Sequence, residues 1–170
     1  MRLSEVNLLS PAEAEELLGG VFEHSSWIVA ETWNQAPFAT LHTLHAALVA
    51  TVEHATSDQQ LALIRAHPDL VGRAAQAGTL TRESTVEQQV AGLSADNLSA
   101  EEVTEFRHLN REYTERFGFP FVICARENKK ASILAGFATR LPNDPDTERQ
   151  SALREISRIA WYRLADLIEN

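Results

Sequence analysis

The sequence has little of what marks secreted or membrane proteins. It contains a single cysteine, Cys124, so no disulfide can form within the chain, and a reducing compartment is expected. The longest apolar stretch, Phe117 to Ala125, includes a glycine and a proline and is about half as long as a transmembrane helix. Only 7 glycines and 6 prolines occur in 170 residues, and no linker or repeat interrupts the chain.

Basic residues are also scarce. The 15 Lys and Arg residues face 24 Asp and Glu residues, which gives a formal net charge of −9. Nucleic-acid binding requires clustered cations, so this class of partner is excluded. A small anionic ligand is still compatible, because one or two cations in a pocket suffice to bind it. The amino end lacks the apolar run of a secretory signal and the carboxyl end is no peroxisomal address, so we expect a cytoplasmic protein.

Helical periodicity runs through most of the chain. From about Phe38 to His54, leucines recur at spacings of three and four, and the segment from Ser99 to Phe117 repeats this pattern. Two more helices are predicted over 129–141 and 146–168. Four serines followed three residues later by Glu or Gln predict helix starts with a capping box: Ser10 with Glu13, Ser57 with Gln60, Ser84 with Glu87, and Ser99 with Glu102.

One segment cannot be a regular helix. Gly118 stops the preceding helix, and Pro120 pushes Phe119 into an extended conformation. An α/β fold would need several β-branched runs, and only residues 119–123 qualify. We therefore predict an all-α fold, with residues 1–170 forming a single compact multi-helix domain.

Arg163 lies where packing would favour an apolar residue. On a helical projection with Ile156 at zero, it falls about 20° away and inside the apolar stripe, whereas Arg154 and Arg158 point outward. A buried guanidinium is costly unless it is paired. Arg163 is thus expected to meet either a protein carboxylate or a ligand anion.

His67 precedes a proline, which ends the helix from Ser57 at this point. A histidine at such a break can transfer protons near neutral pH, or it can simply interact with the helix dipole. Glu87 shares a face with Val90 and Ala91, and its carboxylate either faces the interior or closes the box with Ser84; spacing alone favours the box. Asn110 lies on the stripe of Phe106 and is expected to bind backbone.

The sequence supports neither a metal site nor a nucleophilic catalytic residue. The histidines at 42, 45 and 54 do not converge, and neither a His-Glu-x-x-His motif nor paired Cys-x-x-Cys motifs occur. Cys124 follows an apolar run and is expected to be a small buried hydrophobe rather than a thiol nucleophile.

Taken in order, several motifs closely resemble the 2-oxo-4-hydroxy-4-carboxy-5-ureidoimidazoline (OHCU) decarboxylase family. The similarity spans essentially the whole chain. It is carried by these residues: His67-Pro68-Asp69-Leu70; Ser84-x-x-Glu87-Gln88 with Ala91-Gly92-Leu93; Phe106-x-x-Leu109-Asn110-x-x-Tyr113-x-x-Arg116 continuing to Arg126; Arg140-Leu141; Glu148; and Glu155-Ile156 onward to Arg163-Leu164.

The resemblance implies a cofactor-independent carboxy-lyase of urate degradation that forms (S)-allantoin, with no metal and usually as a homodimer. It places proton transfer on His67, with Glu87 and a carboxyl-terminal arginine, here matched to Arg163, as further catalytic residues. The resemblance also implies a substrate-binding set: Pro68, Ser84, Thr85, Val86, Glu87, Gln88, Phe119, Pro120, Phe121, Val122 and Ile123. The partner is then a small anionic ureidoimidazoline.

Two alternatives predict different structures. A small acidic helical interaction module would expose residues 119–123 as an apolar patch and would leave His67 on the surface without convergent polar groups. A divergent family member acting on a related ureido compound would keep the same fold. The decarboxylase hypothesis predicts that His67, Glu87 and Arg163 line one pocket with residues 119–123.

Overall fold

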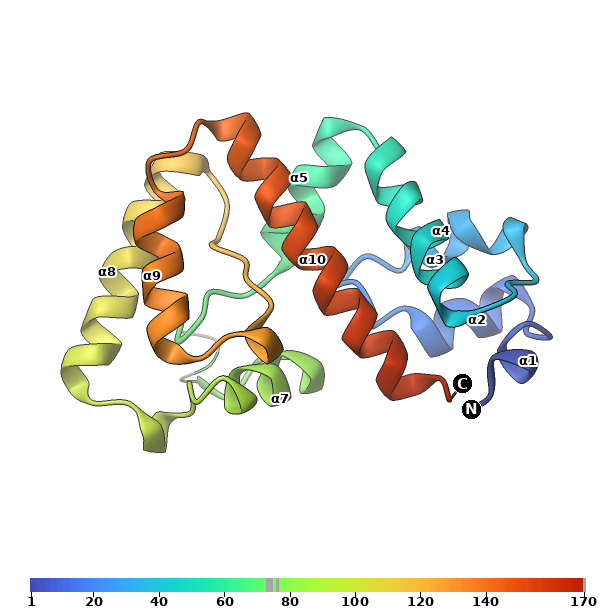
Figure 1. The fold of residues 1–170 in the computed structure, drawn as a ribbon, viewed down its shortest axis with the longest axis horizontal. Helices are drawn as coiled ribbons and strands as arrows, with labels where there is room; N and C mark the ends of the chain where they lie inside the picture. The colour runs from blue at the N-terminus through green and yellow to red at the C-terminus, as the bar shows by residue number, and fades with distance from the viewer. Residues whose placement is uncertain (73–74, 76, 170) are drawn as a thin grey trace. The chain divides into compact units, whose positions relative to one another are not determined.

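The computed structural model describes residues 1–72, 75 and 77–169, and its regular elements are helices (Figure 1). Within this part of the chain the one extended pairing is an isolated bridge between Arg2 and Glu169. The predicted all-α class is therefore confirmed. None of the helices described combines the length and apolar character needed to cross a bilayer.

The chain divides into two compact units. Unit 1 comprises residues 1–66 and 157–170, and unit 2 comprises residues 67–156. Unit 1 contains α1 (Leu3–Val6), α2 (Pro11–Leu18), α3 (Trp27–Thr32), η1 (Trp33–Gln35), α4 (Leu41–His54) and α5 (Ser57–Ala66). Unit 2 contains α7 (Arg82–Val90), η2 (Ala95–Asn97), α8 (Ala100–Phe117), η3 (Ala125–Glu127) and α9 (Lys130–Arg140). Helix α10 (Pro145–Leu167) begins in unit 2 and ends in unit 1, and a single domain over residues 1–170 stays a prediction.

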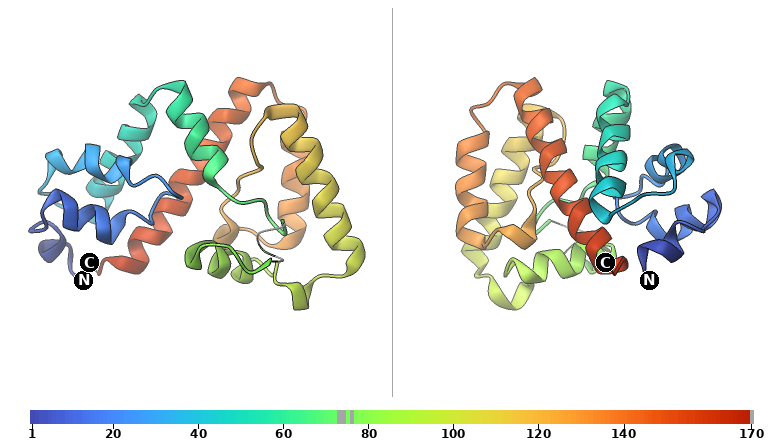
Figure 2. Two further views of the ribbon diagram at one scale, coloured as in Figure 1. Left: turned by 180° about the vertical axis from the view of Figure 1, so that it is seen from behind. Right: turned by 45° about the vertical axis from the view of Figure 1, so that its right-hand side comes forward.

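Unit 1 packs α3 against α2 and α4. Leu44 and Leu48 of α4 are fully buried, as its three- and four-residue spacing predicts. The two ends of the chain meet in this unit (Figures 1 and 2): the Met1 amino group donates to the Leu167 carbonyl at 3.2 Å, and the Glu169 N–H donates to the Met1 carbonyl at 2.8 Å.

Unit 2 is built on aromatic packing. Helices α8 and α9 lie side by side in both views of Figure 2, and their facing surfaces contribute Phe106, Tyr113 and Phe137. Phe121, from the irregular segment, stacks on Phe137 with ring centroids 3.9 Å apart and meets Tyr113 edge to face at 5.2 Å. Such ring pairs contribute about 0.5–1.5 kcal/mol each beyond the area they bury.

Two of the four predicted capping boxes form. Ser10 and Ser99 accept from the N–H of Glu13 and Glu102, whose carboxylates bind back to the serine N–H groups. At the end of α8, Gly118 has φ 75°, and its N–H donates to the Thr114 carbonyl, so the predicted stop is confirmed.

The other two boxes were wrong by a few residues. Helix α5 is capped by Thr56 with Gln59, and Gln60 instead donates to the Val52 carbonyl at 3.0 Å. Helix α7 begins at Arg82 and is capped by Thr81, whose hydroxyl accepts from the Ser84 N–H. A threonine stands one residue before Ser57 and three residues before Ser84, and threonine is, like serine, a preferred cap, so the local pattern fits either start.

Two other boundaries shift slightly. Helix α4 begins at Leu41 rather than Phe38, because Thr40 and Thr43 cap each other there. Helices α9 and α10 differ from the predicted ranges by one residue at each end.

Ser99→Ala removes the hydroxyl that caps α8. We expect the free energy of unfolding to fall by about 1 kcal/mol, because the Glu102 N–H then lacks its side-chain acceptor. Urea unfolding followed by circular dichroism measures this change. Ser99→Asn, which keeps an acceptor, is the matched control and is expected to stay within about 0.5 kcal/mol of the parent. Equal losses in both variants would contradict the capping role.

Candidate active site

His67 begins unit 2 and is held at the end of α5. The helix ends at Ala66, as the following Pro68 predicts, and His67 is only 7% exposed. An imidazole is the side chain whose ordinary pKa lies nearest to neutral pH, so a histidine is suited to proton transfer. The structure thus puts His67 in the interior, where a proton-transfer group is shielded from bulk water.

Helix α7 buries a polar face. Ser84, Glu87 and Gln88 are each no more than 7% exposed, and their spacing of three and four places them on one side of the helix. Thr85 is half-buried and Val86 is exposed. Because Ser84 lies inside the helix, the predicted box with Glu87 is wrong, and the Glu87 carboxylate is an interior group. Buried polar side chains on a face that could be apolar are expected where a protein binds or transforms a polar ligand.

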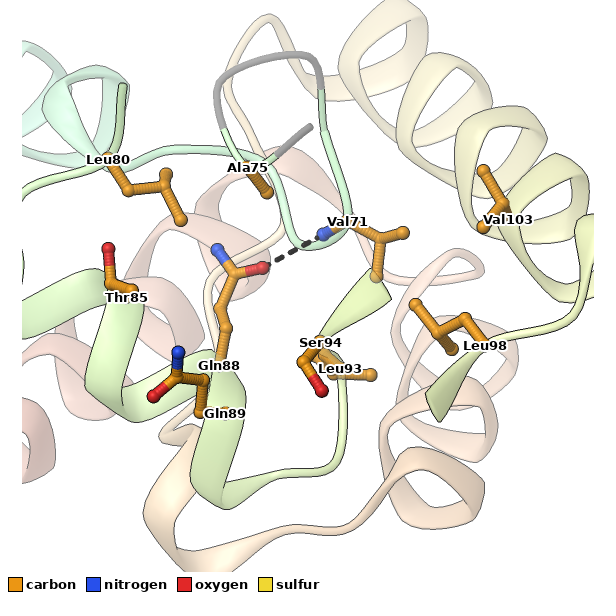
Figure 3. A pocket seen from close by; sticks show the side chains of 10 residues that line it. All are labelled: Val71, Ala75, Leu80, Thr85, Gln88, Gln89, Leu93, Ser94, Leu98 and Val103. Atoms are coloured by element: carbon orange, nitrogen blue, oxygen red, sulfur yellow. Dashed lines mark hydrogen bonds between the residues drawn. The ribbon is translucent and has the colours of Figure 1, made fainter. Parts of the chain in front are cut away.

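Gln88 is tied to the loop that follows His67. Its Oε1 accepts from the Val71 N–H at 3.0 Å (Figure 3). Val71 has φ 55°, a left-handed conformation that costs a β-branched residue about 1–3 kcal/mol. The side chains of Thr85 and Gln88 line a largely apolar cavity of about 230 Å³, with Leu98 and Val103 on the far side.

A second cavity of unit 2, of about 710 Å³, has a charged lining. Pro68 and Asp69 face Arg107 and Asn110 of α8 across it. The Asn110 Nδ2 donates to the Leu70 carbonyl at 2.8 Å, which confirms the prediction that this amide binds backbone. The loop after His67 is therefore anchored on α7 and on α8.

In the irregular segment 119–123 most side chains are used in packing, whereas backbone groups make or can make hydrogen bonds. Phe119, Phe121 and Val122 are buried, and both phenylalanine rings pack against Tyr113. The Val122 carbonyl accepts from Arg140 Nη1 at 2.7 Å. Among the residues described, none accepts a hydrogen bond from the N–H groups of Phe121 and Ile123.

Glu148 holds this segment in place and was not predicted to have a role. Its side chain is fully buried and accepts from the Tyr113 hydroxyl, from Arg140 Nε at 2.6 Å and from Asn143 Nδ2 at 2.8 Å. Burial, together with the hydrogen bond to this carboxylate, raises the pKa of the Tyr113 hydroxyl. Through Arg140 the buried carboxylate thus fixes the Val122 carbonyl.

A sequence signal for Glu148 existed. It lies four residues before the buried Ala152 and eight before the buried Ile156, on the same helix face as Arg163. Extending the helical projection of α10 by two turns toward its amino end would have marked Glu148 as a second buried charge. Its partner Arg140 could not be located in this way, because it belongs to α9.

Cys124 is buried, as predicted, and burial raises the pKa of its thiol to about 11. The thiol is therefore neutral at physiological pH and is a poor nucleophile. Its backbone N–H donates to the Glu155 carboxylate at 2.8 Å, so the residue joins the irregular segment to α10.

Arg163 belongs to unit 1 and is buried within the apolar stripe of α10, as predicted. Its Nη1 donates to Glu23 Oε2 at 2.9 Å and to the Gly20 carbonyl at 3.1 Å. The side chains of Arg163 and Glu23 are 3% and 2% exposed. Of the two expected partners, the protein carboxylate is the one present.

Most of the predicted site residues belong to unit 2, where they lie on α7, at His67 and Pro68, and in the segment 119–123. This helix binds the loop after Pro68 through Gln88, and it packs against η3, which follows residues 119–123 closely in sequence. Lys129 adds a hydrogen bond to the Val90 carbonyl at 2.6 Å. Within the described residues, His, Cys, Asp and Glu side chains form no group of three suited to a metal ion. The arrangement offers an imidazole, a carboxylate, an amide and backbone N–H groups.

Comparison with known proteins identifies relatives over the full chain. The OHCU decarboxylase family profile matches residues 7–165. The 2-oxo-4-hydroxy-4-carboxy-5-ureidoimidazoline decarboxylase of Amia calva is 43% identical over 169 residues, which cover 99% of this chain and 95% of that protein.

Two crystal structures share the fold. An (S)-allantoin synthase is 29% identical with a TM-score of 0.80, and the match covers 99% of this chain but only 54% of that longer one. An OHCU decarboxylase crystallised in the presence of (S)-allantoin is 23% identical with a TM-score of 0.70, and the match covers 93% and 98% of the two chains.

Glu148→Ala leaves Arg140 without its buried carboxylate. We expect the free energy of unfolding to fall by about 3–5 kcal/mol, because the guanidinium stays largely buried and unpaired. Chemical denaturation measures the loss. Glu105→Ala, an exposed glutamate on α8, is the control and is expected to change stability by less than about 0.5 kcal/mol. A similar small effect for both variants would rule out the proposed structural importance of Glu148.

Proposed function

The chain belongs to the OHCU decarboxylase family, and we propose that the polar cluster around α7 in unit 2 is its catalytic site. The enzyme is a carboxy-lyase that converts 2-oxo-4-hydroxy-4-carboxy-5-ureidoimidazoline to allantoin in urate degradation. The observation that carries the site is the buried polar face of α7, which is hydrogen-bonded to the loop that follows His67.

The reaction makes two demands on the protein. Cleavage of the bond to the carboxylate releases carbon dioxide and moves its electron pair toward the ring C=N bond, leaving an enol-like, electron-rich ring. The enzyme must stabilise this charge and deliver a proton to the neighbouring carbon. Protonation from one face alone gives the (S) product.

The residues of unit 2 match these demands. His67 transfers the proton. The Glu87 carboxylate accepts hydrogen bonds from the ureido and ring N–H groups, and the Gln88 amide can accept and donate hydrogen bonds to the same parts of the substrate. The N–H groups of Phe121 and Ile123 are suited to the ring carbonyl or its developing charge. Pro68, Ser84 and Thr85 form part of the protein environment around these groups.

The interaction-module alternative is contradicted by burial. It required exposed residues at 119–123 and an exposed His67, but Phe119, Phe121 and His67 are all no more than 7% exposed. A cytoplasmic location is part of the proposal, and the single buried thiol of Cys124 supports a reducing compartment. The homodimer that the family resemblance implies is also part of the proposal.

His67→Asn tests the proton-transfer role. We expect kcat to fall by about 10²–10⁴-fold, the usual contribution of a general acid or base. The substrate is generated from urate in the cuvette, and circular dichroism follows the optically active allantoin. His108→Asn, at an exposed position on α8, is the control and is expected to keep full activity.

Two results would contradict the assignment. A folded His67→Asn variant with full activity would remove His67 from the mechanism. Racemic allantoin formed at the uncatalysed rate by the parent enzyme would reject the function itself.

Arg163 requires a separate test, because its guanidinium already pairs with Glu23. We propose that Arg163 binds the substrate carboxylate. Arg163→Gln is then expected to raise KM by about tenfold or more, because a charged hydrogen bond is lost. Glu23→Gln keeps the cation and is expected to raise KM less. Steady-state kinetics, measured below the unfolding temperature of both variants, give the two KM values. Equal increases in KM would mean that the ion pair of Arg163 and Glu23 has a purely structural role.

A further inference from the structure

The loop after His67 contains a tight turn of unusual composition. The Gly72 N–H donates to the Asp69 carbonyl at 3.3 Å, so residues 69–72 form a β-turn with Leu70 and Val71 at its centre. A Cβ atom on Gly72 would approach the Cβ of Asp69 to 2.6 Å, so the turn requires glycine at its last position.

Val71 adopts the conformation that such turns reserve for glycine. Its φ of 55°, at the third position and after a residue with negative φ, is that of a type II turn. Types I and II differ by a rotation of the central peptide group, here the one between Leu70 and Val71. A β-branched residue favours type I, so something must hold this peptide in the other orientation.

Two buried amides hold it. Asn110 Nδ2 donates to the Leu70 carbonyl at 2.8 Å, and Gln88 Oε1 accepts from the Val71 N–H at 3.0 Å. The C=O and N–H of one trans peptide point in opposite directions, so α8 and α7 bind the same group from opposite sides. Both side chains are 5% exposed, and the Asn110 Oδ1 has no hydrogen-bond partner among the described residues.

The β-turn also fixes the orientation of the Gln88 side-chain amide. Because Oε1 accepts from Val71, the Nε2 donor is directed away from that residue, toward the side of the cavity that Leu80 and Thr85 line (Figure 3). A rotated peptide would present the Leu70 carbonyl to Gln88 instead. The amide would then reverse and offer an acceptor where it now offers a donor.

We infer that Asn110 is a positioning residue, which holds the Leu70–Val71 peptide and thereby sets the donor direction of Gln88 and the path of the loop from His67. This role rests on the proposed function, because Gln88 and His67 belong to the proposed site. Asn110 acts through its Nδ2 donor, at the expense of an unpaired Oδ1.

The test compares Asn110→Leu with its combination with Val71→Gly. Loss of the donor should lower kcat/KM by about tenfold or more, because one hydrogen bond between Gln88 and the ligand is then lost. Glycine adopts positive φ without strain, so the double variant should recover to within about threefold of Val71→Gly alone. Thr114→Val, at an exposed position one turn along α8 from Asn110, is the control and should keep parent activity.

Amide hydrogen exchange at Val71, measured by NMR, gives a readout independent of turnover. It should be about tenfold faster or more in Asn110→Leu, and unchanged in Thr114→Val. Should Asn110→Leu fail to fold, Asn110→Ala, which also removes the donor, replaces it under the same criteria.

Unchanged kcat/KM in Asn110→Leu, or a loss that Val71→Gly does not relieve, would overturn the inference. The proposed function would fail differently, through a parent enzyme that gives no optically active product, while the exchange result at Val71 would still report on the turn.

Discussion

Glu148 carries its carboxylate into the interior of unit 2, where a charge is tolerated only if donors surround it. Tyr113, Arg140 and Asn143 supply those donors, so α8, α9 and the start of α10 are joined at one point. The same arginine lies over the Phe121 ring at 4.4 Å and binds the Val122 carbonyl. An irregular backbone segment is thereby held as firmly as a helix, which a site built from backbone groups requires.

The two sides of the site are ordered by different forces. Around residues 119–123, aromatic stacking and one buried ion pair fix the backbone. In the loop after His67, two neutral side-chain amides fix the backbone by binding a single strained peptide group. Helix α7 contributes to the second arrangement and packs beside the first through η3. The buried polar face of α7 therefore links the loop after His67 to the segment around η3.

Local rules predicted the helices and the breaks between them well. Three- and four-residue spacing located α4 and α8, and Gly118 and Pro68 ended helices where expected. The start of α7 was misplaced because Thr81 and Ser84 are both good caps and only packing selects one. The partners of buried charges were beyond reach, since Glu23 is 140 residues from Arg163 and nothing in local spacing links them. The family resemblance suggested the site residues, whereas the partners that Glu148 and Asn110 bind required coordinates.

The division of the chain has a consequence for biosynthesis. Unit 2 is continuous in sequence, but unit 1 is assembled from residues 1–66 and 157–170. During translation all of unit 2 is therefore synthesised before the residues that complete unit 1 are added. Until Arg163 emerges, Glu23 has no cation at the position where the two side chains meet in the finished protein. The first segment to be made is thus among the last to reach its final packing.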